Sequence, residues 1–318
     1  MSKMNKIYLS PAFNKRTDGE LEFLRTVDGT SGFSLFWIDI VKPLLCELKV
    51  KHLLEVGALK GDHTRLLSQY CDTFDATLIV IEPIVTPSLQ KVIGSSARIH
   101  LFAEKSQTAL PRVAASVDAV LLEGDLNYYT VHNDLLSIAQ LSRRQNIPFP
   151  IVFFASASWP YARRDMYYDP ESLPITARHD YAKMGMTPWS SELEEGMINF
   201  LFANARHEGG PKNGVLTAAE DFIDGSELSL HLFRLPINHG LGIIYPKGSR
   251  TEEFIRTNLF FPPLLGRFLE TCELARLNEI IRRLQPQQRQ RYSKQGFRSG
   301  LARLLRRLGR VMIRMIEK

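Results

Sequence analysis

The sequence predicts an α/β protein built on a mostly parallel sheet with helices on both faces, and three observations support this fold class. A short apolar run ends in closely spaced glycines, which is typical of a buried strand that turns tightly into a helix. Four further apolar runs alternate with helical sequence, as parallel strands do. The last two runs are joined so closely that they must pair antiparallel. The seven runs lie at 52–56, 76–81, 97–102, 117–122, 151–155, 228–235 and 240–245.

The turn after the first run indicates a ligand site. Glu55, Gly57 and Gly61 lie where the chain must bend sharply and let a ligand approach closely. The second run ends at Glu82, the place where a doubly wound sheet bonds ribose hydroxyls. The glycines do not form the pyrophosphate fingerprint G-x-G-x-x-G, and Asp62 would repel a phosphate. These residues suit a ligand with a ribose and a positive centre, such as S-adenosylmethionine, although a plain strand–turn–helix without a ligand is the alternative.

With Glu-x-Gly-x-x-x-Gly after strand 1 and an acid after strand 2, the chain resembles class I S-adenosylmethionine-dependent methyltransferases. The resemblance spans residues 35–247 and includes the closing antiparallel pair. It implies a seven-stranded Rossmann-like sheet, with a long lid after strand 5 and a C-terminal helical extension beyond it. The cofactor-binding residues that it implies lie at strand tips and are Glu55, Gly57, Gly61, Glu82, Glu104 and Glu123.

Three blocks, 123–131, 159–168 and 207–217, resemble a narrower branch, the macrocin-O-methyltransferase-like enzymes found near polysaccharide and glycosylation genes. In that branch, carboxylates at the strand tips bind a divalent cation, and a nearby histidine takes a proton. This chain departs from the pattern, with Leu126 in place of the histidine and Ala155-Ser156 in place of His-Asp. Magnesium needs hard oxygen ligands in a near-octahedral array. We therefore assign no metal ligand and doubt a metal cofactor, unless Asp165 or Glu208 substitutes from the lid.

The resemblance implies an O-methyltransferase that acts on a sugar, a glycan or a glycosylated small molecule. A hydroxyl acceptor must lose a proton, and the catalytic candidates are Asp125 and His207, with His179 behind them. The alternatives are that Asp125 caps a helix and that the loop histidines are solvated. The alternative function is a non-catalytic binding or scaffold subunit, because the branch's histidine and His-Asp pair are missing.

The lid at 156–214 is rich in aromatic residues and arginine, with one expected helix at about 191–205. Aromatic faces stack on sugar rings, and arginine grips carboxylates or phosphates in a planar fork. The alternative is that these side chains pack the lid's own small core. The predicted substrate-binding residues are Trp159, Tyr161, Arg163, Arg164 and Tyr168.

Length and composition set further bounds. A chain of 318 residues can bury a sizeable core. Three widely separated cysteines form neither a metal knuckle nor a disulfide framework, which favours a reducing, cytoplasmic location. Residues 1–20 lack the apolar core of a signal peptide, and no apolar run reaches the roughly 20 residues that span a bilayer. We expect an arm at 1–30, a main domain at 31–250, a helical extension at 251–286 and a basic tail at 287–318.

Residues 286–318 hold ten Lys/Arg and one acid, Glu317, so the tail carries +9 and the rest of the chain −3, for the net charge of +6. From Leu301 its apolar residues form one stripe of a helix, opposite a face of arginines. This pattern suits an anionic membrane surface contacted by residues 298–318, and hence a peripheral place at the inner face of the membrane. The alternative is packing on the body or on a second copy in a homo-oligomer. The body is mildly acidic, so no nucleic acid is expected.

Overall fold

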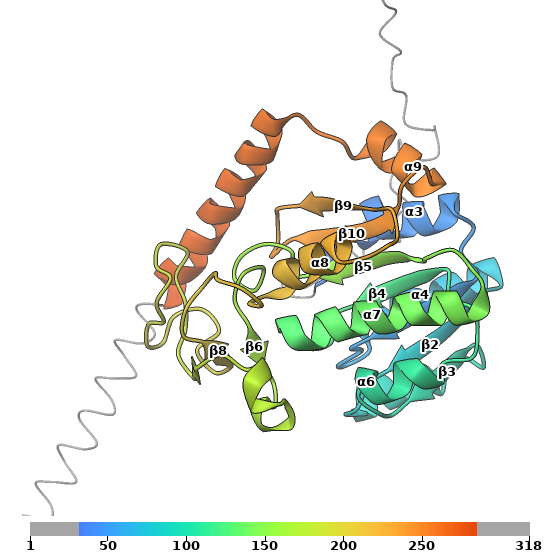
Figure 1. The fold of residues 1–318 in the computed structure, drawn as a ribbon, viewed down its shortest axis with the longest axis horizontal. Helices are drawn as coiled ribbons and strands as arrows, with labels where there is room; N and C mark the ends of the chain where they lie inside the picture. Colours follow the sequence, from blue (N-terminus) through green and yellow to red (C-terminus); the bar gives the residue numbers. More distant parts are fainter. Residues whose placement is uncertain (1–31, 285–318) are drawn as a thin grey trace, which may run out of the picture.

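The computed structural model describes residues 32–284, so the expected arm at 1–30 and the basic tail at 287–318 lie outside the described residues. A seven-stranded sheet forms the centre, in the order β3-β2-β1-β4-β5-β10-β9 (Figure 1). β1 to β5 are parallel, and β10 runs antiparallel to both of its neighbours. The predicted fold class is therefore confirmed. The strands are β1 (His52–Val56), β2 (Thr77–Ile81), β3 (Ile99–Phe102), β4 (Ala119–Leu122), β5 (Ile151–Ala155), β9 (Leu230–Leu235) and β10 (Leu241–Pro246).

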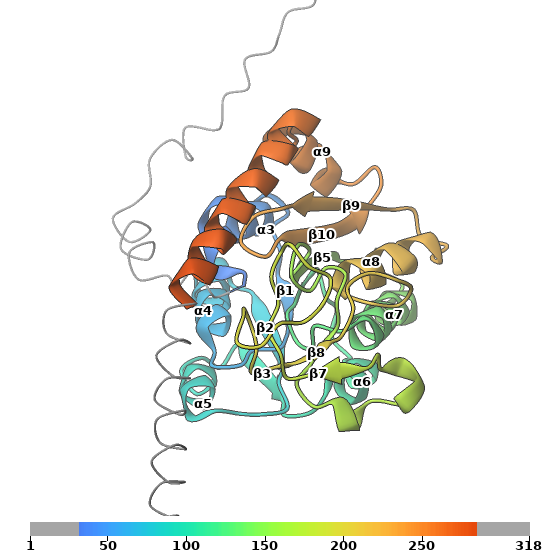
Figure 2. The same ribbon diagram turned by 90° about the vertical axis from the view of Figure 1, so that its left-hand side faces the viewer.

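Helices cover both faces of the sheet and create two apolar cores (Figures 1 and 2). Alternate strand residues enter opposite cores, so Leu53 packs on one face and Leu54 on the other. Burial on both sides explains why these strands read as continuous apolar runs. One face holds α2 (Ser34–Phe36), η2 (Trp37–Val41), α3 (Lys42–Glu47), α4 (Asp62–Phe74), α5 (Pro87–Ile93) and α9 (Arg250–Asn258). The other holds α6 (Ser106–Ala109), η3 (Leu110–Arg112), α7 (Tyr128–Gln145) and α8 (Val215–Asp224).

The helix before β1 is interrupted where the sequence places Pro43. Proline has no backbone N–H and its ring crowds the preceding turn, so a regular α-helix cannot run through it. The chain widens into the π-helical turn η2 and then restarts as α3, with Pro43 in its first turn. The predicted kink or restart is thus present, and it keeps Trp37 and Val41 in the core.

The lid folds as a small sheet of its own, in the order β6-β8-β7. Its strands are β6 (Met166–Tyr167), β7 (Tyr181–Ala182) and β8 (Ala203–Ala205), with short 3-10 turns η4 (Pro170–Ser172) and η5 (Ile175–Ala177) between the first two. The predicted helix at 191–205 is wrong. Gly196 and Asn199 have positive φ angles of 71° and 61°, which an α-helix does not allow. Ile198 is buried against Leu277 and Ile281.

Beyond α9, residues 263–284 are helical, as the spacing of their apolar residues predicts. Figure 1 shows this helix running from the region of α9 down to the lid. It buries Leu277 and Ile281 against Ile198. None of the helices between residues 32 and 284 is long and apolar enough to cross a membrane.

Candidate functional site at the carboxyl edge of the sheet

The strand order reverses between β1 and β4, and ligands of open α/β sheets bind outside the carboxyl ends of the strands at such a point. Three predicted cofactor residues meet there. Glu55 lies in β1, Glu82 follows β2 and Glu123 follows β4. The last two are close enough to raise the pKa of the Glu55 carboxyl, although burial is the larger cause.

Glu55 is the least satisfied of these carboxylates. Its side chain is 2% exposed, and burial raises its pKa to about 7. The hydroxyl of Thr64 donates to Oε2 at 2.7 Å. Oε1 accepts no hydrogen bond from the described part of the protein. A buried acceptor without a partner is costly, so this oxygen is suited to a donor that arrives with a ligand.

Glu82 fixes the glycine turn. Its Oε2 accepts from the amides of Ala58 and Leu59 at 3.0 and 2.9 Å, and its Oε1 accepts from the amide of Ile84 at 2.9 Å. Gly57 needs to be glycine because its φ is 88° and a Cβ would collide with the backbone of Glu123. A carboxylate offers about four acceptor positions, so Glu82 retains acceptor capacity after holding the turn.

Glu123 is paired with a histidine that the sequence analysis missed. His63, in the first turn of α4, lies 3.1 Å from Glu123 through Nδ1. The amide of Ser34 donates to Nε2 at 3.1 Å, so the ring proton is on the Glu123 side. Burial opposes the charged imidazole, but Glu123 outweighs it and raises the pKa of His63. The Phe33 ring also lies edge-on to His63, so the start of the described chain closes over this pair.

Asp125 lies at the start of α7 without capping it. Asn127 is the N-cap and accepts from the amide of Thr130 at 2.8 Å, whereas Asp125 accepts from the Thr130 hydroxyl at 3.3 Å. Burial raises the pKa of Asp125. Tyr168 reaches the same edge from the lid. Burial, followed by the carboxylates of Glu123, Asp125 and Glu82, raises the pKa of its phenol to about 12, although the side chain is half exposed.

The two lid histidines make their contacts within the lid. His207 pairs with Glu192 through Nδ1 at 2.9 Å, and both side chains are largely exposed. The Nε2 of His179 lies 2.9 Å from the carbonyl of Lys212. The structure therefore does not bring either ring to Asp125, and their catalytic role stays a prediction.

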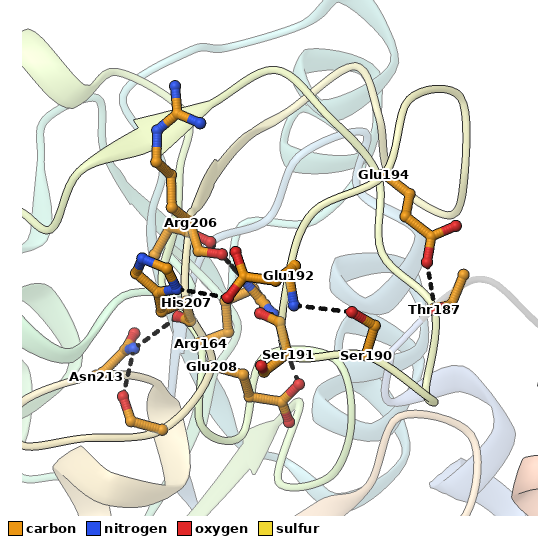
Figure 3. A network of polar contacts seen from close by, with 12 residues as sticks. Arg164, Thr187, Ser190, Ser191, Glu192, Glu194, Arg206, His207, Glu208 and Asn213 are labelled. Carbon is orange, nitrogen blue, oxygen red and sulfur yellow. Dashed lines mark hydrogen bonds and ion pairs between the residues drawn. The ribbon is translucent and has the colours of Figure 1, made fainter.

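Arg164 is fully buried and serves the lid itself (Figure 3). Its guanidinium donates to the carbonyls of Ala205, Arg206 and Ser191 at 2.5, 3.0 and 2.6 Å. Glu208 lies 3.6 Å away and balances its charge. Burial lowers the pKa of Arg164. All of these contacts join lid segments, so this arginine is not available to an acceptor.

The other predicted lid residues are also engaged. Arg163 forms a fork with Glu220 of α8 at 2.5 and 2.8 Å. Tyr161 is buried and donates to Oδ1 of Asn204 at 3.1 Å. Trp159 packs between the lid and the helix at 263–284. These placements fit the alternative of a packed lid core, and of the five predicted substrate-binding residues Tyr168 alone is more than half exposed at the sheet edge.

The lid carboxylates considered as metal ligands have other partners. Asp165 is fully buried and accepts from the amides of Tyr128 and Gly214, both at 2.7 Å, and from the Tyr167 hydroxyl. Glu208 is paired with Arg164. Between residues 32 and 284, no group of three or more His, Cys, Asp or Glu residues is placed to hold a metal ion.

The remaining strand tips complete the edge. Glu104, after β3, pairs with Arg112 at 2.5 Å. At the end of β5, Ala155 is 4% exposed in the core and Ser156 has a φ of 62°. The β9–β10 turn adds His239, whose pKa is lowered, with burial the largest cause and Glu123 a weak opposing one. The sequence analysis named neither Asp134 nor His239. Asp134 lies on the apolar stripe of α7, a position from which its burial could have been predicted. No sequence pattern marks His239.

No protein-family model and no curated protein sequence matches the chain. Among solved structures, a methyltransferase from Podospora anserina with S-adenosylhomocysteine bound is 15% identical, with 64% of this chain and 76% of that one aligned and a TM-score of 0.41. A Staphylococcus aureus structure assigned as a caffeoyl-CoA O-methyltransferase is 13% identical, with 72% and 90% aligned and a TM-score of 0.42. The S-adenosylmethionine-dependent methyltransferase SibL is 15% identical, with 67% and 56% aligned and a TM-score of 0.37. These values are too low to support an inference on their own. The strand order, with its closing antiparallel pair, gives this chain the class I methyltransferase fold.

Proposed function

We propose that this protein is an S-adenosylmethionine-dependent O-methyltransferase that acts on a sugar, a glycan or a glycosylated small molecule. The observation that carries the proposal is the Glu55 carboxylate, buried at the tip of β1 with one unpartnered oxygen. It lies beside the glycine turn at the point where the strand order reverses. A cationic or hydroxyl-bearing ligand would satisfy that oxygen.

The residues at this edge fit the cofactor. Glu123 provides negative charge for a positive centre, and so does Glu55 in its ionised form, which a nearby cation favours. Glu82 keeps acceptor capacity for ribose hydroxyls beside the turn that it fixes. Glu104 provides a further carboxylate at the tip of β3. When bound, the cofactor supplies an activated methyl group on its sulfonium. The protein's own residues must then align the acceptor hydroxyl in line with that methyl group and accept the hydroxyl's proton.

Asp125 is the proposed proton acceptor. It follows β4 at the same edge, and burial raises its pKa toward the range in which a carboxylate accepts a proton efficiently. Its hydrogen bond from Thr130 orients the group. His207 is paired with Glu192 in the lid, so we rank it below Asp125.

The sugar acceptor is supported by the sequence resemblance and by an aromatic surface beside Asp125. Tyr168 and Phe202 lie edge to face with ring centroids 5.8 Å apart, and both side chains are partly exposed. Such a surface suits the apolar face of a sugar ring. Because Arg163 is paired with Glu220 of α8 and Arg164 is engaged inside the lid, we favour neutral glycosides over acidic ones.

The proposal is tested in two steps. Calorimetry with S-adenosylhomocysteine should show micromolar binding, and absence of binding would refute the function. Transfer of a labelled methyl group is then measured to methyl glycosides of glucose, rhamnose and glucuronic acid, with a neutral glycoside expected to react fastest. The variant Asp125→Asn should bind the cofactor normally and lose at least 100-fold in turnover, the usual contribution of a general base. Cofactor binding without any transfer would favour the scaffold alternative.

A further inference from the structure

The β9–β10 turn is held by a helix outside the methyltransferase sheet. Three successive residues of this turn, Asn238, His239 and Gly240, have φ angles of 48°, 66° and 89°. Two of them are not glycine, and the left-handed conformation strains a residue that carries a Cβ. A conformation of this kind persists only when neighbouring groups stabilise it.

Glu273, from the helix at 263–284, stabilises the turn in this conformation. Its carboxylate accepts from the amides of Asn238 and His239 at 3.0 and 3.1 Å. Successive left-handed amides form a concave site for an anion, and here the anion is this side chain. Arg276, one turn later, donates twice to the same carboxylate at 2.8 and 2.6 Å. Glu273 is 6% exposed, so these hydrogen bonds lie in the interior of the protein.

The β9–β10 turn also holds the end of β5 by hydrogen bonds. The carbonyl of His239 accepts from the amide of Ser158 at 2.7 Å, and the carbonyl of Gly240 accepts from the amide of Ala157 at 3.2 Å. A Cβ on Gly240 would collide with the Ser158 backbone. The His239 ring lies 3.4 Å through Nδ1 from the carbonyl of Trp159, where the lid begins.

The same helix also contacts the lid directly. Leu277 and Ile281 pack on Ile198, and Trp159 and Leu284 pack against the same cluster. Figure 1 shows the helix descending to the lid. Its contacts therefore lie with the lid and with the β9–β10 turn.

We propose that Glu273 is a positioning residue for the acceptor half of the site. Its carboxylate fixes the β9–β10 turn, and through that turn it fixes His239, the end of β5 and the base of the lid. The cofactor half, built on Glu55, Glu82 and the glycine turn, does not depend on it. This assignment rests on the proposed methyltransferase function, since it divides that site into two halves.

The experiment compares Glu273→Ala and Glu273→Gln in the full-length protein with Glu279→Gln, a change at an exposed glutamate of the same helix that pairs with Arg283. By NMR, the amides of Asn238 and His239 should exchange with solvent at least tenfold faster in Glu273→Ala and at the wild-type rate in the control. In Glu273→Gln the His239 ring should titrate at lower pH, because Glu273 raises its pKa whereas Arg276 lowers it. In both Glu273 variants, turnover on the glycoside that the wild type methylates fastest should fall at least tenfold.

The affinity for S-adenosylhomocysteine should stay within twofold of wild type in all three variants. Unchanged exchange and an unchanged His239 titration would overturn the proposal. A loss of cofactor affinity as large as that caused by Glu82→Ala would also overturn it, because Glu273 would then act on the whole site. If the wild-type protein does not bind S-adenosylhomocysteine, the proposed function fails, whereas the exchange measurement still decides whether Glu273 holds the turn.

Discussion

The tips of β1 and β2 and the lid use charged side chains in opposite ways. At the strand tips, Glu82 holds the glycine turn and Glu55 keeps an oxygen without a partner. In the lid, Arg163 and Arg164 are taken up by a glutamate and by backbone carbonyls. The sheet positions its tips by strand pairing and apolar packing, so their side chains remain available for a ligand. The lid has only small apolar clusters, so its charged side chains must hold its segments together.

The largest effect is expected from Arg164→Met, which leaves three carbonyls and Glu208 without their buried donor. Loss of one partner of a buried ion pair costs about 3–5 kcal/mol of unfolding free energy. Urea denaturation measures this loss. Arg206→Met is the control, because that side chain is exposed in the same lid and should change stability by less than about 0.5 kcal/mol. Equal stability of the two variants would show that the lid does not depend on Arg164.

The next effect concerns the tips of β1 and β2. Glu82→Ala removes two hydrogen bonds from the glycine turn and one from Ile84, and it should weaken S-adenosylmethionine binding by about 1–3 kcal/mol, the cost of losing bonds to a charged group. Calorimetry measures the affinity. Asp72→Ala, at the far end of α4, should leave it unchanged. If Glu82→Ala binds the cofactor as tightly as wild type, the strand-tip carboxylates are structural like those of the lid.

The third effect is graded with pH and tests the cost of a buried charge without a strong partner. Asp134 is 1% exposed, and burial raises its pKa from 3.8 to about 8. Between these two pH values the folded state holds a proton that the unfolded state has released, so unfolding free energy falls as pH rises. Asp134→Asn should remove up to about 1.4 kcal/mol per pH unit of this slope. Urea midpoints of both proteins at pH 5 and 7.5 measure it, and parallel profiles would contradict the assignment.

The smallest effect is expected from removal of metal. Ala155 offers no ligand atom, and Asp165 already accepts two amides and a hydroxyl. A chelator should therefore leave turnover on the reactive glycoside within about twofold, a difference of less than 0.5 kcal/mol. Activity that is lost with chelator and regained with magnesium would show that the site gathers ligands from the lid after all.

The sequence was sufficient for the sheet because strand burial leaves a pattern in the chain. Continuous apolar runs and Glu-x-Gly predicted β1 to β5, and the close spacing of the last two runs predicted their antiparallel pairing. Strand ends differ from the predictions by two residues or fewer. Each predicted strand-tip carboxylate consequently lies at the carboxyl edge.

The lid could not be predicted in the same way. Its strands are two or three residues long, which is too short for a period to show. One helix was predicted at about 191–205, but Gly196 and Asn199 turn the backbone left-handed there. His63 joins the site through its contact with Glu123, and the turn that carries His239 is held by Glu273, so both depend on residues far away in sequence. Long-range partners of this kind leave no local pattern.

The contacts of Asp165 determine how this protein could be redesigned. One carboxylate holds the first amide of α7 and the amide of Gly214, the N-cap of α8, so the root of the lid is part of the main fold. Exchanging the whole segment 156–214 with another enzyme would remove that joint and leave the start of α7 without an acceptor. The segment between β6 and β7 carries η4 and η5 and lies beyond the joint. Residues 169–180 are therefore the place to graft new sequence when a different acceptor is wanted.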